Sequence, residues 1–172
     1  MSQQTQNLMK KISLAKVVLN MGIGKSGEPI EIGKKTLTQI TGKKPNTRNA
    51  KKSQRDWGVR KGEPIGIAVT VRGNDATELL KKLLVVKDNQ IAEKAFDNEG
   101  NLSFGINEHI DIPGIKYDPK IGILGLEVSI SLARPGFNIK FNKSKAKVGK
   151  NHRITKNDAI KFLTEEFGVK VV

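Results

Sequence analysis

The sequence contains no cysteine, and it has few aromatic and few acidic residues. Disulfide bonds and thiolate zinc sites are therefore excluded, and nothing in the composition points to an oxidising compartment. No apolar run approaches the ~20 residues that a membrane-spanning helix needs. The N-terminal residues also lack the continuous apolar stretch of a secretory signal. We therefore expect neither a membrane-spanning segment nor a secretory signal.

The shortage of acidic residues leaves a large excess of positive charge. The chain has 31 Lys and Arg against 17 Asp and Glu, a formal net charge of +14 and a pI of about 10.0. Two windows, 42–62 and 134–156, hold 16 of the basic residues and a single acidic one, Asp56. Such runs repel themselves unless a polyanion neutralises them, and nucleic acid is the commonest one because each neutralised phosphate releases a counterion.

Two alternatives to nucleic-acid binding exist for these windows. They could be solvated, flexible loops that bind nothing. They could also lie on an anionic membrane, but neither window shows the amphipathic helical pattern that this mode requires. We therefore expect a nucleic-acid partner and no membrane partner.

The length of 172 residues suits one domain, 1–172, with basic excursions at 42–62 and 134–156. The low mean hydropathy of −0.40 fits a chain with long segments that face solvent or RNA. Alternating apolar and polar residues predict strands at 14–21, 65–72, 101–107 and 124–132. The predicted helices are 29–40, ended by Gly42; a helix opened by a capping box at Asp75 and Glu78; and a helix opened by Thr155 and Asp158 and ended by Gly168.

Strands with only three helices predict an α+β fold, in which helices pack on one face of a mostly antiparallel sheet. The second face of the predicted strands is small and polar, and Glu127 is its only acidic residue. Its residues are Gly66, Ala68, Thr70, Arg72, Asn101, Ser103, Gly105, Asn107, Gly125, Glu127, Ser129 and Ser131, to which strand 14–21 adds Lys16 and Asn20 but also Leu14 and Val18. Small side chains allow an RNA backbone to approach, and amides and hydroxyls suit ribose and phosphate oxygens. The alternative, a water-facing sheet surface, normally carries longer charged side chains, so we predict an RNA-facing face.

A glycine motif offers a different function. Residues 22–27, GIGKSG, match G-x-G-x-x-G between a predicted strand and a predicted helix. Dinucleotide binding would require a second, parallel strand that ends in an acidic residue about 20 positions later, but a basic window follows instead. A nucleotide-dependent enzyme is therefore the second candidate, and a plain glycine-rich turn is the simpler interpretation.

Other chemically suggestive residues are sparse. Glu108, His109 and Asp111 suggest a metal cluster only weakly, because the one other histidine, His152, lies in a basic run that repels cations. We expect a turn there, and no metal, cofactor or small-molecule substrate. The single tryptophan, Trp57, lies among arginines and could either stack on a nucleobase or anchor the loop to the sheet.

Several segments, in order, resemble the L5 family of large-subunit ribosomal proteins, which binds 5S rRNA. They are KVVLNMGIGKSGE, TGKKP, GEPIGIAVTVRG, FGINEHIDIPGIKYDPKIGILGLEVSI and RPGF…KNHRITKNDAIKFL, and the likeness runs from about residue 12 to the end. The later blocks are of archaeal or eukaryotic type, and the short N-terminus favours archaeal. The resemblance implies a non-enzymatic protein of the large subunit, located in the cytoplasm.

The resemblance also implies partners. The sheet face would hold 5S rRNA and help attach it to the large rRNA at the central protuberance, and the protein would take part in a bridge to a ribosomal protein of the small-subunit head. The expected 5S rRNA contacts are Asn20, Lys43, Thr70 and Arg72, which match motifs of the family, and Lys16, which lies on the polar face. Lys43 stands where the family often has Gln, so a contact there would depend on charge.

Two further sets complete the predicted RNA contacts. The loop from about Thr47 to Lys61 is similar to the one that approaches P-site tRNA, and its expected contacts are Arg48, Lys51, Lys52, Arg55, Trp57, Arg60 and Lys61. The second basic window is expected to bind rRNA through Arg134, Lys140, Lys143, Lys145, Lys147, Lys150, His152 and Arg153.

Overall fold

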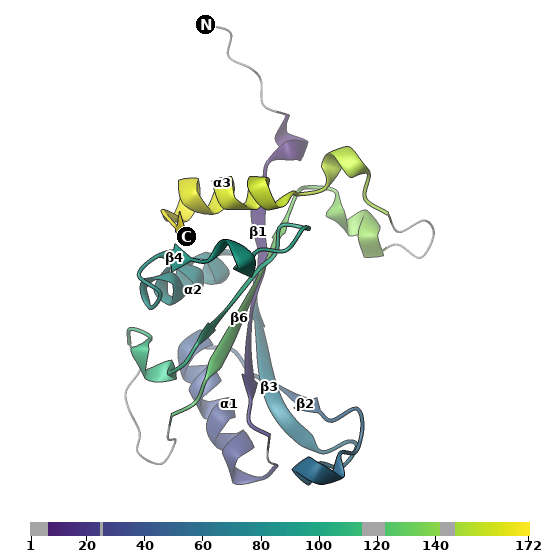
Figure 1. Ribbon diagram of the computed structural model, residues 1–172, viewed down its shortest axis with the longest axis vertical. Coiled ribbons are helices and arrows are strands. Elements are labelled where there is room, and N and C mark those ends of the chain that lie inside the picture. The colour runs from purple at the N-terminus through teal and green to yellow at the C-terminus, as the bar shows by residue number, and fades with distance from the viewer. Residues whose placement is uncertain (1–6, 25, 115–122, 142–146) are drawn as a thin grey trace, which may run out of the picture.

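The protein is built on one five-stranded antiparallel sheet with helices on one side (Figure 1). The computed structural model describes residues 7–24, 26–114, 123–141 and 147–172. The strands are β1 (Ser13–Gly22), β2 (Asn46–Asn49), β3 (Pro64–Val71), β5 (Leu102–Ile106) and β6 (Leu126–Ala133), in the order β2-β3-β1-β6-β5. The helices are α1 (Glu28–Thr41), α2 (Asn74–Val85) and α3 (Lys156–Phe167). The predicted α+β class is confirmed.

The register of the strands gives the sheet two different faces. On β1, Leu19 pairs with Val69 of β3 and Val128 of β6, and all three are buried in the core beneath the helices. The next residue, Asn20, pairs with Ala68 and Glu127 on the opposite face. Because side chains alternate along a strand, this register separates an apolar face from a polar one across the sheet.

The ends of α1 and α3 follow their capping signals. Pro29 lies in the first turn of α1, and Gly42 ends this helix in the left-handed region at φ 65°. In α3, Thr155 accepts a hydrogen bond from the backbone of Asp158, and the Asp158 carboxylate accepts one from the backbone of Thr155. This capping box and the left-handed Gly168 are both confirmed.

The predicted start of α2 is wrong. The helix begins after Gly73, so Asp75 already lies inside the first turn and caps nothing with its side chain. Its carboxylate pairs instead with Lys43 Nζ at 2.8 Å. An acidic side chain in a first turn also favours the helix by interacting with its dipole, so the residue type fits without a capping box.

Three of the observed strands were not predicted from the sequence. The edge strand β2 occupies part of the basic window 42–62, so residues 46–49 belong to the sheet and not to an excursion. A parallel pair of two-residue strands, β4 (Gln90–Ile91) and β7 (Lys170–Val171), ties the C-terminus to the segment after α2. Among the described residues, no helix is long and apolar enough to cross a membrane.

Candidate nucleic-acid interface

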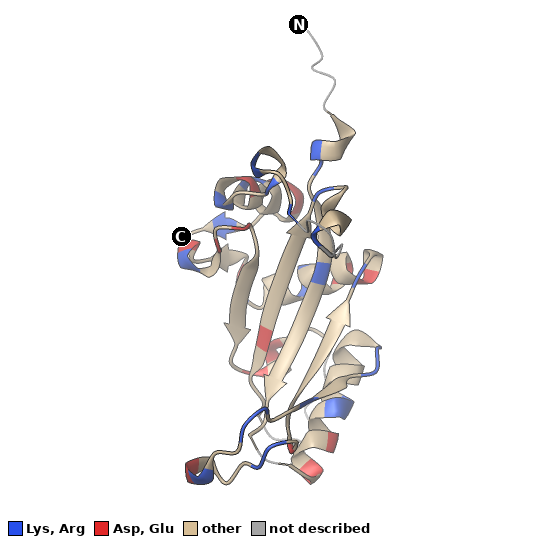
Figure 2. Ribbon diagram, turned by 90° about the vertical axis from the view of Figure 1, so that its right-hand side faces the viewer, with Lys and Arg blue, Asp and Glu red and all other residues tan. Residues whose placement is uncertain are grey.

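None of the three α-helices α1, α2 and α3 lies on the polar face of the sheet. Figure 2 shows the five strands from this side, with few charged residues along them. Two rows of paired residues cross it, one through Thr70, Val18, Ser129 and Ser103, and the other through Asn46, Ala68, Asn20, Glu127 and Gly105. The structure therefore brings together the small polar residues that the sequence placed on one face.

Asn20 and Glu127 interact at the centre of the polar face. Asn20 Nδ2 donates a hydrogen bond to Glu127 Oε2 at 3.1 Å. The predicted RNA contact Asn20 therefore has one amide hydrogen engaged by the one acidic residue of the face. An approaching phosphate would be repelled by this carboxylate, so Glu127 opposes the binding that its neighbours favour.

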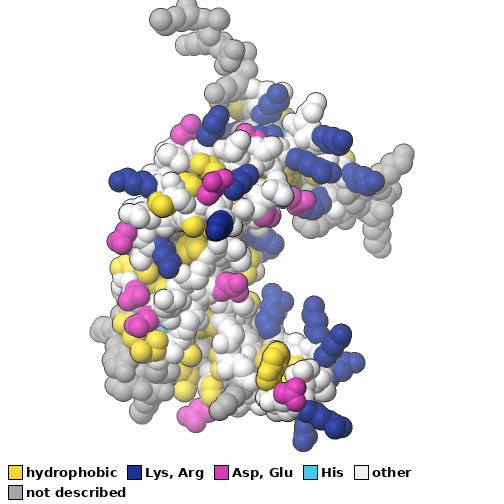
Figure 3. All heavy atoms as spheres, in the orientation of Figure 1, with side chains coloured by type: hydrophobic (Ala, Val, Ile, Leu, Met, Phe, Trp, Pro, Cys, Tyr) yellow, Lys and Arg dark blue, Asp and Glu magenta, His cyan; other side chains and the backbone are white. Residues whose placement is uncertain are grey.

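A hollow of about 700 Å³ lies where the polar face meets the second basic window. Four basic residues line it: Lys16 on β1, Arg72 after β3, and Arg134 and Lys140 after β6. The hollow thus joins two predicted sets, the 5S rRNA contacts and the further rRNA contacts, which lie far apart in the sequence. Figure 3 shows the concave outline of this side, with Lys and Arg side chains on both projecting ends.

The lower projecting end is a basic loop, residues 50–63, which the chain's own backbone holds in shape. Gln54 and Val59 exchange backbone hydrogen bonds of 2.8 and 3.1 Å. At the base, Ala50 bonds in the same way with Glu63 and Gly62, at 2.8 and 2.9 Å. The predicted loop boundary at Thr47 is therefore too early, because residues 47–49 pair with β3.

Two predicted tRNA contacts take different positions in this region. Trp57 is 78% exposed near the tip of the basic loop, so the alternative in which it anchors the loop to the sheet is wrong. Arg48 lies on β2 opposite Gly66, whose own partner on β1 is Gly22. Arg48 thus shares the polar face, and the structure places it with the sheet residues.

Glu63 clamps the basic loop to the glycine-rich turn. Its carboxylate accepts hydrogen bonds from the backbone of Arg60 at 2.9 Å and from Ser26 Oγ at 3.0 Å. These two bonds, with the Arg60 charge, lower the pKa of Glu63. Ile23 and Gly24 both donate to the carbonyl of Ile65, at 3.0 and 2.9 Å.

The glycine-rich turn is therefore structural. Gly24 and Gly27 have φ of 76° and 95°, which other residues rarely adopt, so the turn itself requires glycine. Its strand, β1, has antiparallel neighbours on both sides, so the parallel strand needed for a dinucleotide site is absent from the sheet as described. The described sheet therefore lacks the strand arrangement that the second candidate, a nucleotide-dependent enzyme, requires.

Lys43 lies apart from the hollow. Its ammonium pairs with Asp75 in the first turn of α2, and this hydrogen bond lowers the pKa of Asp75. The Lys43 side chain is 40% exposed and does not line the hollow. Its contact with 5S rRNA remains a prediction.

Several basic residues of the second window contact their own chain. Lys140 pairs with Glu99 at 3.2 Å, His152 Nε2 lies 2.8 Å from the carbonyl oxygen of Pro135, and Arg153 Nε donates to Val148 at 3.2 Å. The Lys147 and Lys150 side chains are exposed. The remaining predicted contacts of this window, Lys143 and Lys145, lie outside the described residues.

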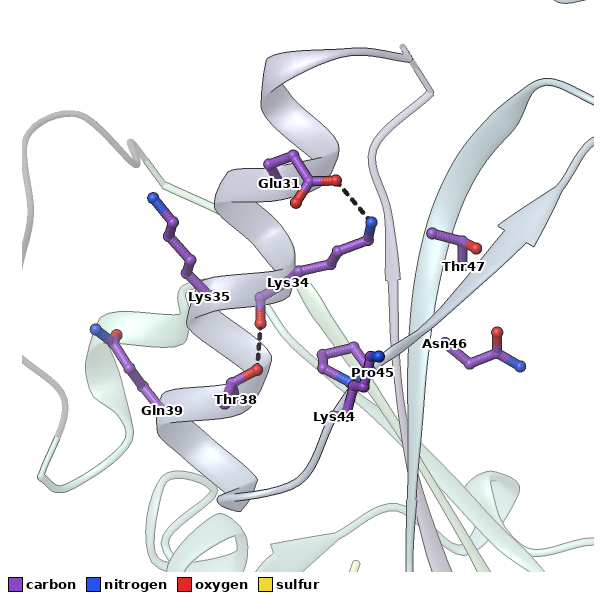
Figure 4. Close-up of a pocket in the computed structure, with 9 residues that line it drawn as sticks. All are labelled: Glu31, Lys34, Lys35, Thr38, Gln39, Lys44, Pro45, Asn46 and Thr47. Carbon is purple, nitrogen blue, oxygen red and sulfur yellow. Dashed lines mark hydrogen bonds and ion pairs between the residues drawn. The ribbon is translucent and has the colours of Figure 1, made fainter.

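A second basic groove, of about 640 Å³, lies between α1 and β2 (Figure 4). Lys34, Lys35 and Lys44 line it, and Lys34 Nζ pairs with Glu31 at 2.7 Å. Sequence reasoning missed this groove because Lys34 and Lys35 precede the first basic window. Helical periodicity alone does not reveal that Lys34 points toward an edge strand (Figure 4).

The suspected metal cluster lies in a short turn, in which His109 is buried while Glu108 and Asp111 are exposed. His109 is 1% exposed, and its Nδ1 accepts a hydrogen bond from the backbone of Leu124 at 3.3 Å. Within the part of the chain that the structure describes, no group of three or more potential ligand residues could hold a metal ion.

Comparisons with known proteins identify the family of the chain. Residues 7–60 match the family profile described as ribosomal protein L5, and residues 64–162 match the profile for the C-terminus of the same ribosomal family. The large ribosomal subunit protein uL5 of Nitrosopumilus maritimus strain SCM1 is 64% identical over 172 residues, 99% of each chain. The uL5 proteins of Cenarchaeum symbiosum strain A and Pyrobaculum aerophilum are 58% and 45% identical, over 95% of this chain and 98% and 92% of theirs.

The family profiles and these relatives identify the class, a ribosomal protein and not an enzyme. More particularly, the chain belongs to the ribosomal protein L5 family, whose members are constituents of the large ribosomal subunit. The resemblance of its segments to that family is thereby confirmed, and the relatives named above are archaeal.

Proposed function

We propose that this protein, as a structural component of the large ribosomal subunit, binds 5S rRNA with the polar face and the hollow beside it. It helps attach 5S rRNA to the large rRNA at the central protuberance. The observation that carries the proposal is the convergence of the cations Lys16, Arg72 and Lys140 around one hollow at the end of the polar face. Clustered cations beside small polar residues suit a phosphate backbone that must approach closely.

The basic loop 50–63 has a separate role in this proposal, which is contact with P-site tRNA. It projects from one end of the sheet, between β2 and β3, whereas the segment that follows β6 and lines the hollow lies at the other end (Figure 1), and backbone hydrogen bonds hold the loop in shape. The exposed Trp57 offers an aromatic surface for stacking, and the arginines beside it can meet phosphates. The proposed part in a bridge to a small-subunit head protein rests on family membership.

A binding experiment on the purified protein tests the main proposal. We expect tight, salt-dependent binding to 5S rRNA in a filter assay with tRNA as competitor. If about six phosphates are neutralised, affinity falls by roughly two to three decades between about 50 and 200 mM salt. Affinity that stays flat across this range would contradict a phosphate-dominated interface.

Two single variants then locate the interface. Arg72→Ala removes a charge from the hollow, whereas Lys81→Ala removes one from the exposed surface of α2, on the helix side of the sheet. We expect Arg72→Ala to weaken binding about tenfold and to reduce the salt slope by about one, with Lys81→Ala near wild type. Equal losses in both variants would show that only the net charge matters.

A further inference from the structure

Arg134, one of the predicted rRNA contacts, is largely buried where the chain leaves β6. Its side chain is 11% exposed. Nη1 donates to the backbone oxygens of Arg153 at 3.2 Å and His152 at 3.5 Å, and Nη2 donates to Asp158 Oδ2 at 3.2 Å. The end of the guanidinium is therefore engaged inside the protein.

Asp158 connects this group to α3. The same oxygen that receives Arg134 also accepts the backbone N–H of Thr155 at 3.2 Å in the capping box. Arg134 thus joins the end of β6, the end of the second basic window and the first turn of α3. A guanidinium can reach three acceptors in this way because its donors are held in a planar fork.

Neighbouring contacts close the base of the second window. His152 Nε2 lies 2.8 Å from the Pro135 oxygen, and the rings of His152 and Phe137 meet edge to face with centroids 5.6 Å apart. Phe137 and Gly136, held by this base, line the hollow together with Arg134. The wall of the hollow therefore depends on how the two ends of the window are joined.

We propose that Arg134 and Asp158 form a latch that sets the described part of the second basic window, residues 134–141 and 147–156, in its RNA-binding position. Arg134 is a positioning residue, and the phosphate contacts are made by Lys140, Lys147 and Lys150. A preset segment gives tighter binding because less ordering entropy is lost on association. This inference rests on the proposed RNA-binding function.

Neutralising Asp158 distinguishes a latch from a direct contact between Arg134 and RNA, because the two predict opposite changes in RNA affinity. If Arg134 contacted a phosphate directly, Asp158→Asn would release the guanidinium and add one positive charge, and RNA affinity would rise. If Arg134 is a latch, Asp158→Asn loosens the window, and affinity falls roughly three- to tenfold. Glu99→Gln is the control for charge alone, because it frees the exposed Lys140 and should raise affinity.

Two more variants distinguish loss of the latch from loss of α3 stability and from a change in total charge. Thr155→Val removes the capping hydroxyl of α3 but leaves the Arg134–Asp158 pair, so it should lower the melting temperature with little loss of affinity. Arg134→Lys keeps the charge but cannot reach three acceptors, so it should weaken binding as Asp158→Asn does. Combining Arg134→Lys with Asp158→Asn should cost no more than the larger single change, because both break one interaction.

The experiment measures 5S rRNA affinity of the full chain and, without RNA, its rate of trypsin cleavage after Lys147 and Lys150. We expect Asp158→Asn and Arg134→Lys to be cleaved several-fold faster there than wild type or Thr155→Val. Tighter RNA binding by Asp158→Asn, or equal affinity losses in Thr155→Val and Asp158→Asn, would overturn the latch. If the wild-type protein bound no 5S rRNA, the proposed function would be wrong. The cleavage rates, measured without RNA, would still show whether Arg134 and Asp158 hold the window in place.

Discussion

The basic loop 50–63 provides the sharpest test of the proposal that the polar face binds 5S rRNA and the loop contacts P-site tRNA. The change is the triple substitution of Arg55, Trp57 and Arg60 by alanine. Backbone bonds between Gln54 and Val59 and between Ala50 and its partners hold the loop, so the three side chains are dispensable for its shape. We therefore expect a folded protein whose loop has lost two charges and its aromatic surface.

The cost to stability follows from the exposure of Trp57. The residue is 78% exposed. With about 250 Å² for a tryptophan side chain, the protein then covers roughly 55 Å², worth at most about 1.4 kcal/mol at about 25 cal/mol per Å². In a chain of this size, that corresponds to a melting temperature about 3–6 °C lower.

The effects on binding should differ between the two RNAs. Because the loop shares no residue with the hollow, the affinity of the free protein for 5S rRNA and its salt slope should stay near wild type. Loss of one stacked base contact costs about 1–3 kcal/mol, so tRNA should leave the P site of mutant ribosomes at least about fivefold faster.

The assays are filter binding at several salt concentrations and the rate of tRNA dissociation from assembled ribosomes. Arg48→Ala is the matched control, because Arg48 belongs to the same basic window but lies on the polar face. It should weaken 5S rRNA binding and leave tRNA release unchanged. A 5S rRNA salt slope that falls by about two in the triple variant would refute the division, since two phosphate contacts would then belong to the loop.

Three further predictions concern single side chains. Glu127→Gln should bind 5S rRNA about three- to fivefold more tightly at low salt, because a carboxylate about 7 Å from a phosphate costs roughly 0.6 kcal/mol even in water; weaker binding would show that Glu127 accepts a hydrogen bond from RNA. Thr70→Val should weaken 5S rRNA binding several-fold with an unchanged melting temperature, because it removes a hydroxyl of the polar face; a parallel drop in melting temperature would make the effect structural. The Glu63 pKa is lowered on folding, so this carboxylate stabilises the fold above its unfolded pKa and the stabilisation is lost as pH falls through the folded pKa. The melting temperatures of wild type and Glu63→Gln, measured from about pH 6 down to about pH 3, should therefore converge on acidification, and a constant gap would contradict this.

The central strands were predictable because each has one buried face. On β1, Val17, Leu19 and Met21 alternate with less buried residues, and this period of two appears directly in the sequence. The edge strand β2, with the sequence NTRN, has no such alternation. It forms because β3 offers backbone partners, and only the tertiary structure reveals this.

The residues of the interface were only partly predictable. The small polar face follows from strand alternation, but the hollow joins Lys16 and Lys140, which no local pattern relates. Conversely, basic composition did not distinguish Lys147, which is exposed, from Arg134, whose guanidinium is engaged internally. Charge counts predict that a surface binds RNA, whereas burial decides which cations remain available to it.

The position of the single tryptophan gives the protein a built-in optical reporter. Trp57 is the only indole in the chain, and it stands exposed on the basic loop, away from the packed core. Fluorescence excited at the red edge of the indole band therefore comes from this loop alone. Stacking on a nucleobase would quench that emission, whereas unfolding of the core would change it little. Engagement of the loop can thus be followed in the unlabelled protein.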